Sequence, residues 1–204
     1  MFARLTCSTD FNLLTLPFSS VTNTLPTEKS RTKQSRALST LHWASAPLLI
    51  GSIGCVLTAQ SAEKKDKGNW MWRHKSLGLL SFFVFIPRVA VKLSSAAPGM
   101  LKGSSVAEHM VAKVSHFGLY SFMAVMPVTG IAMGLFGGAG LPFFFTKIEA
   151  PKSMKNGAVA KQSFWLHKNI GYYGKFIVPL HVSAAGMHAA RGHSIFARIN
   201  PFAK

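Results

Sequence analysis

The sequence predicts an all-α integral membrane protein, a four-helix bundle with antiparallel up-down topology. Of its 204 residues, 49% are apolar, and the mean hydropathy is +0.26. Four apolar runs each come close to the length of about 20 residues that a helix needs to cross a bilayer. Because backbone polar groups inside a bilayer must pair within their own segment, we expect these runs to be helices.

Polar connections separate the four expected spans, and connections this short make neighbouring spans antiparallel. Pro127 and Pro179 should kink the third and fourth spans, which a bundle tolerates. Trp70, Trp72 and Trp165 are placed as interfacial anchors. The spans run from about residue 41 to 59, 74 to 93, 111 to 136 and 165 to 190, so that residues 41–204 make one membrane domain.

Residues 1–40 differ in composition from the rest of the chain. They are rich in Ser, Thr and basic residues, and their only acids are Asp10 and Glu28. This composition is typical of a mitochondrial transit peptide, and the segment from Arg36 to Thr40 resembles a processing site with cleavage near Ser39. A disordered basic tail is the alternative. The transit-peptide interpretation predicts a multi-pass protein of the mitochondrial inner membrane.

The formal charge of +17 is compatible with binding either to nucleic acid or to an anionic membrane surface. The basic residues lie mostly between apolar runs and no nucleic-acid motif is present, so we expect membrane lipid as a partner and no nucleic acid. Cys7 and Cys55 cannot build a disulfide framework. No Cys-x-x-Cys-His sequence is present, so any haem would be bound without a covalent attachment.

The fourth apolar run carries three histidines at helical spacing. His167 and His181 are 14 residues apart, or about 21 Å along a helix, which places one near each edge of a hydrocarbon layer about 30 Å thick. Small residues between them would leave room for a flat macrocycle. A helix with interfacial histidines and a small-residue packing face is the alternative. Steps of four and three visit His167, Gly171, Gly174, Val178, His181, Ala185 and His188.

The antiparallel order matches these histidines with others. We call side A the face where the first span starts and side B the opposite face. His42 then lies at side A with His181, and His74 lies at side B with His167. The arrangement predicts two haem b groups, each held by two axial histidines, because intramembrane ionisable residues are functional candidates. His116 begins the third span at side A.

An ordered set of motifs carries a family resemblance over residues 41–202. The sequence resembles the bacterial cytochrome b561 family, four-helix di-haem b proteins related to cytochrome b subunits of nickel hydrogenases and formate dehydrogenases. Within that family it is most similar to superoxide oxidases. The matching features are His42-Trp43, His74-Lys75-Ser76-Leu77-Gly78, Arg88, His116, Tyr120, Pro127, Gly130, Leu166-His167, Gly171, Leu180-His181, His188 and Arg198-x-x-Pro201.

The resemblance implies that spans one, two and four supply the four haem ligands, which agrees with the pairing above. Arg88 is a candidate partner for a haem propionate, or a snorkelling interfacial arginine. His116 is a candidate haem contact, or a structural hydrogen-bonding residue. His188 is a candidate hydrogen-bonding partner for a quinone, or a surface histidine.

An iron closed by two imidazoles favours electron transfer over oxygen binding. The sequence therefore predicts a membrane di-haem cytochrome that transfers electrons, an oxidoreductase with superoxide as donor and ubiquinone as acceptor. Basic loops would attract a small anion. One alternative is a subunit of a larger respiratory complex that exchanges electrons with the other subunits. Another is a haem-free structural membrane subunit.

Overall fold

The computed structural model describes residues 28–95, 100 and 103–202, with the backbone alone for 28–35. Within this part of the chain, five α-helices are joined by short irregular segments, two 3₁₀ turns and one small hairpin. In chain order these are α1 Glu28–Ser61, α2 Lys64–Leu93, α3 Val106–Phe136, β1 Leu141–Phe143, β2 Thr146–Ile148, η1 Lys152–Met154, α4 Gly157–Gly174, α5 Ile177–Ala190 and η2 Phe196–Ile199.

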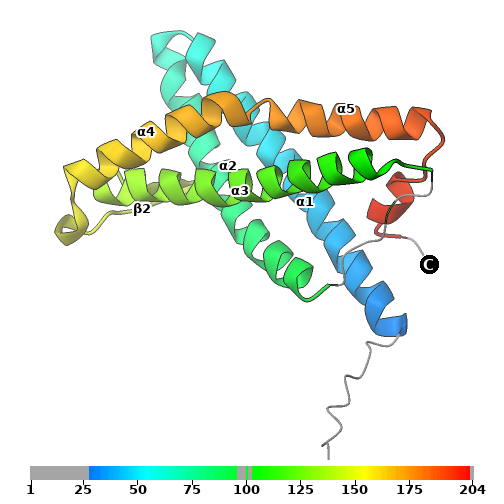
Figure 1. The fold of residues 1–204 in the computed structure, drawn as a ribbon. Helices are drawn as coiled ribbons and strands as arrows, with labels where there is room; N and C mark the ends of the chain where they lie inside the picture. Colours follow the sequence, from blue (N-terminus) through cyan, green and yellow to red (C-terminus); the bar gives the residue numbers. More distant parts are fainter. Residues whose placement is uncertain (1–27, 96–99, 101–102, 203–204) are drawn as a thin grey trace, which may run out of the picture.

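The helices form two antiparallel layers (Figure 1). One layer is the α1–α2 pair, and the other is α3 with α4 and α5 running back along it. The layers cross, and α2 packs on α3 where they meet. The predicted all-α membrane helical bundle is confirmed.

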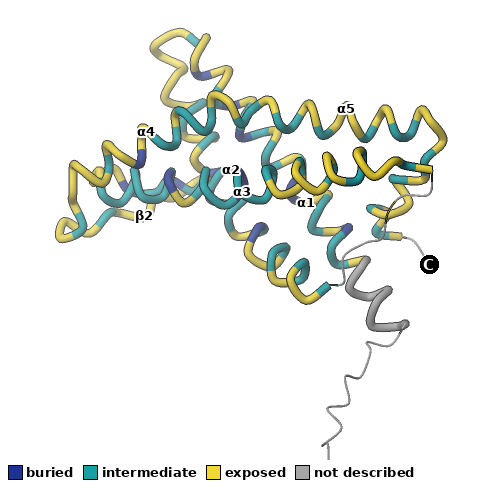
Figure 2. The backbone as a smooth tube through the Cα atoms, viewed as in Figure 1, coloured by how far each residue is buried: buried dark blue, intermediate teal, exposed yellow. Residues whose placement is uncertain are grey.

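Three helices are long and apolar enough to cross a membrane among the residues described: Arg36–Ser61 of α1, Lys64–Leu93 of α2 and Val106–Phe136 of α3. Few side chains of residues 36–95, 100 and 103–202 are buried within the protein, as the scarcity of dark blue in Figure 2 shows. Ile50, Phe83 and Phe117 are examples of large apolar side chains left exposed. Such surfaces are compatible with lipid as the surrounding solvent. The protein is a multi-pass membrane protein.

The fourth span is two helices, and in this respect the expected single helix from His167 to His188 is wrong. The chain leaves α4 after Gly174, and α5 begins at Ile177. Pro179 is the cause, because it has no N–H to donate to the carbonyl of Lys175 and its ring crowds that carbonyl. The two halves still continue in the same general direction beside α3 (Figure 1).

Gly174 allows α4 to approach α3 closely. A Cβ atom at this position would overlap the ring of Phe122, which is buried on α3. Even an alanine side chain would therefore force the Phe122 ring to move or the helices to separate. The contact fixes the distance between the helix that carries His167 and the helix beneath it.

Local capping explains where α3 and α4 begin. Ser105 accepts the N–H of Glu108 at 3.2 Å, and the Glu108 carboxylate accepts the N–H of Ser105 at 2.8 Å, which is a capping box. Asn156 accepts the N–H groups of Ala158 and Val159 in the same way at the start of α4. Both helices consequently start upstream of the apolar runs that predicted them.

Helix α1 also starts early, at Glu28. Residues 28–40, the last part of the predicted transit peptide, are thus helical, and residues 1–27 lie outside the described part of the chain. The predicted cleavage near Ser39 falls within α1. The boundary between presequence and membrane domain stays a prediction.

A β-hairpin in the connection between α3 and α4 was not expected from the sequence. Leu141 pairs with Ile148 and Phe143 with Thr146, which leaves Phe144 and Phe145 as a two-residue turn. The hairpin is attached to α2, since the Trp72 indole N–H donates to the carbonyl of Phe144 at 2.7 Å. It therefore lies at side B, near the start of α2.

Candidate functional site

The structure brings His74 of α2 and His167 of α4 together at side B. Their ring centroids are 6.0 Å apart and the ring planes are nearly perpendicular, at 82°. The residues come from different layers of the bundle, 93 positions apart in the chain. The pair therefore depends on the crossing of the two helix layers.

Each of these side B histidines has its Nδ1 atom held by a neighbouring group. His74 Nδ1 lies 2.9 Å from the carbonyl oxygen of Ser52, which can only accept, so Nδ1 must carry the proton. His167 Nδ1 lies 2.9 Å from Thr129 Oγ1, whose own hydrogen goes to the carbonyl of Val125 at 2.8 Å. Both imidazoles thus present an unprotonated Nε2, the nitrogen that a metal ligand needs.

His42 of α1 and His181 of α5 form a second pair at side A. Their ring centroids are 6.4 Å apart, with the planes inclined at 56°. His116 lies against His181, with 5.2 Å between ring centroids, and its Nδ1 is 2.6 Å from the carbonyl of Ala112 in its own helix. Three of the candidate histidines therefore gather at this end of the bundle.

Arg88 lies beside the side A pair. One guanidinium nitrogen is 3.1 Å from His42 Nδ1, another donates to the carbonyl of Leu41 at 3.2 Å, and Nε is 3.4 Å from the hydroxyl oxygen of Tyr120. Because a guanidinium can only donate, His42 Nδ1 accepts here and the proton lies on Nε2. This tautomer is the opposite of the one at side B.

His188 lies farther along α5, away from the two pairs. Its Nδ1 is 2.9 Å from Nδ1 of His193, to which the sequence had given no role. A separate ion pair, Arg191 with Glu108 at 2.6 Å, ties this end of α5 to the start of α3. His188 therefore belongs to a polar cluster at the end of the bundle.

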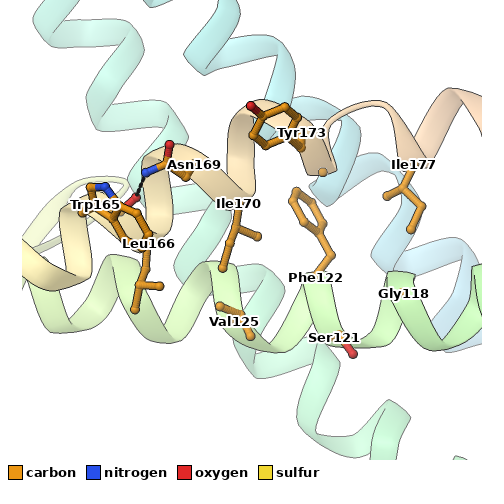
Figure 3. Close-up of a pocket in the computed structure, with 11 residues that line it drawn as sticks. Gly118, Ser121, Phe122, Val125, Trp165, Leu166, Asn169, Ile170, Tyr173 and Ile177 are labelled. Atoms are coloured by element: carbon orange, nitrogen blue, oxygen red, sulfur yellow. Dashed lines mark hydrogen bonds between the residues drawn. The ribbon is translucent and has the colours of Figure 1, made fainter.

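An apolar groove lies between α3 and α4–α5 (Figure 3). Its volume is about 560 Å³. The amide of Asn169 donates to the carbonyl of Trp165 at 2.7 Å, so this polar side chain is already bonded. The lining contains no histidine and no charged residue, which suits hydrocarbon better than a metal-containing group. It consists of Gly118, Ser121, Phe122, Val125, Trp165, Leu166, Asn169, Ile170, Tyr173, Gly174 and Ile177.

The comparison with protein families agrees with this arrangement of histidines. A family model described as Prokaryotic cytochrome b561 matches residues 33–201, most of the chain. The chain belongs to the prokaryotic cytochrome b561 family. It is accordingly a membrane cytochrome b, a haem b protein of electron transfer. The comparison with curated proteins finds no match to this cytochrome b561.

The spacing of the two histidine pairs fits haem b. An imidazole nitrogen bonds a first-row metal at about 2 Å, so two axial imidazoles on one iron hold their ring centroids roughly 6 Å apart. The observed values are 6.0 Å at side B and 6.4 Å at side A. At side B the tautomers also suit a metal, because both histidines keep the proton on Nδ1 and leave Nε2 free. At side A the proton of His42 lies on Nε2, so Arg88 would have to move away from Nδ1 and the proton would have to shift there before Nε2 could bind a metal.

Sequence reasoning missed the residues that hold the histidines. Ser52 and Thr129 are both buried and each lies inside an apolar span. A polar residue in such a run needs an internal partner, and this was the available signal. Their partners could not be named from the sequence, because Ser52 and His74 lie on different helices, as do Thr129 and His167.

Proposed function

We propose that this cytochrome b561 holds two haem b groups and works as a superoxide:ubiquinone oxidoreductase of the mitochondrial inner membrane. His42 and His181 would hold one haem at side A, and His74 and His167 the other at side B. The observation that carries the proposal is the spacing of the two pairs, 6.4 and 6.0 Å between ring centroids.

Haem b, when bound, would supply reversible storage of one electron. The protein contributes orientation. Ser52 and Thr129 keep the side B imidazoles in the tautomer that can bind, and such partners also raise the basicity of a ligating imidazole. The two pairs lie toward opposite ends of the bundle, so the protein spaces the sites along a path across the membrane.

Arg88 and His116 would serve side A. The guanidinium of Arg88 is a permanent cation in a mostly apolar bundle, and a propionate carboxylate is the kind of partner it binds best. Moving to such a carboxylate would release His42 Nδ1. His116, packed edge-on against His181, would limit the rotation of that imidazole.

Ubiquinone becomes ubiquinol by taking two electrons and two protons, so two superoxide ions are oxidised to dioxygen for each quinone. His188 is the proposed quinone residue, beyond the side A pair. Its contact with His193 requires one Nδ1 to donate and the other to accept, so a proton is held between the two rings. When His193 donates and His188 Nδ1 accepts, His188 Nε2 carries the hydrogen and can donate it to a quinone carbonyl.

Basic residues around side B would gather superoxide. Two of them are paired with acids, Lys65 with Glu63 and Lys147 with Glu149, each at 3.0 Å. Exposed charges of this kind raise the encounter rate of a small anion and are screened over about 10 Å at 0.1 M salt. The set comprises Lys64, Lys65, Lys67, Arg73, Lys75, Lys147, Lys152, Lys155, Lys161 and Lys168.

The test is stopped-flow mixing of the purified haem-loaded protein with superoxide, with and without ubiquinone. We expect the haems to be reduced by superoxide alone, at a rate that falls as salt rises, and ubiquinol to form when quinone is added. His188→Ala should slow ubiquinol formation without loss of haem. His109→Ala, a histidine outside both pairs, is the matched control.

An electron-transfer subunit of a larger respiratory complex is the alternative function. In that case the haems would be reduced only when a dehydrogenase partner is added, and superoxide alone would leave them oxidised. A haem-free structural subunit would purify in mild detergent without a cytochrome spectrum. Either result would refute the proposed oxidoreductase.

A further inference from the structure

The turn of the β-hairpin carries an unusual concentration of exposed aromatic surface. Phe145 is fully exposed, at 104%, and Phe144 is 39% exposed. Phe143, the last residue of β1, packs edge-on against Phe144 with 5.0 Å between ring centroids. Three consecutive phenylalanines therefore occupy the tip of a short surface hairpin, where polar turn residues are the usual choice.

The backbone at the tip favours a smaller residue than the one present. Phe144 has φ of 49°, in the left-handed region where glycine or asparagine is least strained. A bulky aromatic residue at such a position is an outlier. Its ring is thus not explained by the conformation of the turn: one part packs on Phe143, and the rest faces outward beside the fully exposed ring of Phe145.

The polar backbone groups of Phe144 are satisfied by α2. Its N–H donates to Ser76 Oγ at 2.8 Å, and its carbonyl accepts the indole N–H of Trp72 at 2.7 Å. Ser76 is completely buried. Phe144 therefore loses little when it leaves water, because unpaired backbone groups are what make a non-aqueous setting costly.

The hairpin is held at the level where α2 enters the apolar layer. Trp72 lies in the first turns of α2, where an interfacial tryptophan is expected. Lys75 is the last charged residue before an uncharged run from residue 76 to 87. Two contacts that bracket this boundary fix the hairpin tip at the depth of the membrane interface.

The surrounding charge favours a negatively charged lipid surface. The connection between α3 and α4, residues 137–156, contains three lysines and one acid, Glu149. Basic residues beside apolar side chains are the combination that binds anionic headgroups and inserts aromatic rings among them. A tip held at the depth of the membrane interface lies among lipid headgroups, where it is less accessible to a water-soluble protein partner.

We infer that Phe144 and Phe145 insert into the headgroup layer of an anionic bilayer on side B, as an interfacial anchor. Lys147, Lys152 and Lys155 of the same connection bind the headgroups around them, so that of the side B basic residues those on α2 and α4 are left to attract superoxide. Through Trp72 and Ser76 the anchor holds the start of α2, and His74 lies between these two residues in the chain. The anchor therefore fixes the depth of one of the paired histidines.

The test is photo-crosslinking from position 145 in native membranes containing the full-length protein. Phe145 is replaced by p-benzoylphenylalanine, a close aromatic analogue that reacts with neighbouring C–H bonds. Ser153→p-benzoylphenylalanine, at an exposed site of η1, is the matched control. We expect mass spectrometry to find phospholipid adducts at position 145, at several times the yield found at position 153.

Three results would overturn the inference: a protein adduct at position 145, an unreacted label there, or equal lipid yields at the two positions. Purified protein in phosphatidylcholine vesicles, with and without phosphatidylglycerol, tests the lysines. The lipid yield at position 145 should fall when phosphatidylglycerol is left out, and an unchanged yield would contradict the role of charge. Phe144→Gly removes one ring from a position where glycine is less strained, and the lipid yield from position 145 should fall in that variant.

Discussion

Thr129→Val tests whether the groups behind the histidines determine haem binding. Thr129 is buried, and its Oγ1 is the partner of His167 Nδ1 at 2.9 Å. Valine has nearly the same shape, so the packing of α3 is kept while the acceptor is removed. His167 then loses its side-chain partner, and only the backbone carbonyl of Met126 is left to select the tautomer with a free Nε2.

The expected loss is large enough to measure. Removing a partner of this kind from a metal-binding histidine typically lowers metal affinity about 10- to 100-fold. That range corresponds to about 1.4–2.7 kcal/mol, similar to the cost of leaving one buried polar group unpaired. Side A should be unaffected, because His42 and His181 make no use of Thr129.

The assay combines haem content with a redox titration that resolves the two haems, followed by the rate of haem transfer to apomyoglobin. Thr58→Val is the control, since Thr58 makes the same kind of hydrogen bond to its own helix, at 2.9 Å to Gly54, but on an exposed face. Equal haem loss in the two variants would refute the reasoning. Unchanged haem transfer from Thr129→Val would refute it as well.

Two further predictions concern packing and processing. Gly174→Ala should lower the free energy of unfolding by about 1–3 kcal/mol, because the new Cβ overlaps the ring of Phe122; thermal unfolding in detergent measures this, and Gly186→Ala, with open space around its Cβ, should not show the loss. The mature protein should begin near Ser39, where the composition of the presequence ends; N-terminal sequencing of the assembled protein would contradict this by finding Met1.

The class of fold could be predicted because hydrophobic length is a strong signal. Apolar runs near 20 residues long predicted membrane helices, and the bundle follows from their number and short connections. The break between α4 and α5 was foreseen only as a kink at Pro179. How far a proline opens a helix depends on the neighbours that re-satisfy the freed carbonyl, and a single sequence does not contain that information.

The histidine pairs could be predicted because topology alone decides which ends of the spans meet. In any antiparallel order of four spans, His42 and His181 lie toward side A. His74 and His167 lie toward side B. Contacts between side chains are a different matter. Such contacts depend on the rotation of each helix about its axis. Examples are the hydrogen bond that His74 donates to the carbonyl of Ser52, the contact of Arg88 with His42 and the contact of His188 with His193.

The hairpin escaped prediction for a similar reason. Its strands have three residues each and show no alternation of apolar and polar side chains. Leu141-Pro142-Phe143-Phe144-Phe145 contains no Asn-Gly or Asp-Gly signal for a tight turn. The turn is instead held by hydrogen bonds from α2, which lies about 70 residues earlier in the chain.

The haem content of four single variants, His42→Ala, His74→Ala, His167→Ala and His181→Ala, tests the central claim most directly. Each purified variant is assayed for total haem and, by redox titration, for which haem is left. We expect His42→Ala and His181→Ala to lose the same haem and keep the other, and His74→Ala and His167→Ala to do the reverse. If His74→Ala and His181→Ala both lost one haem while both kept the other, the proposed pairing across the bundle would be wrong.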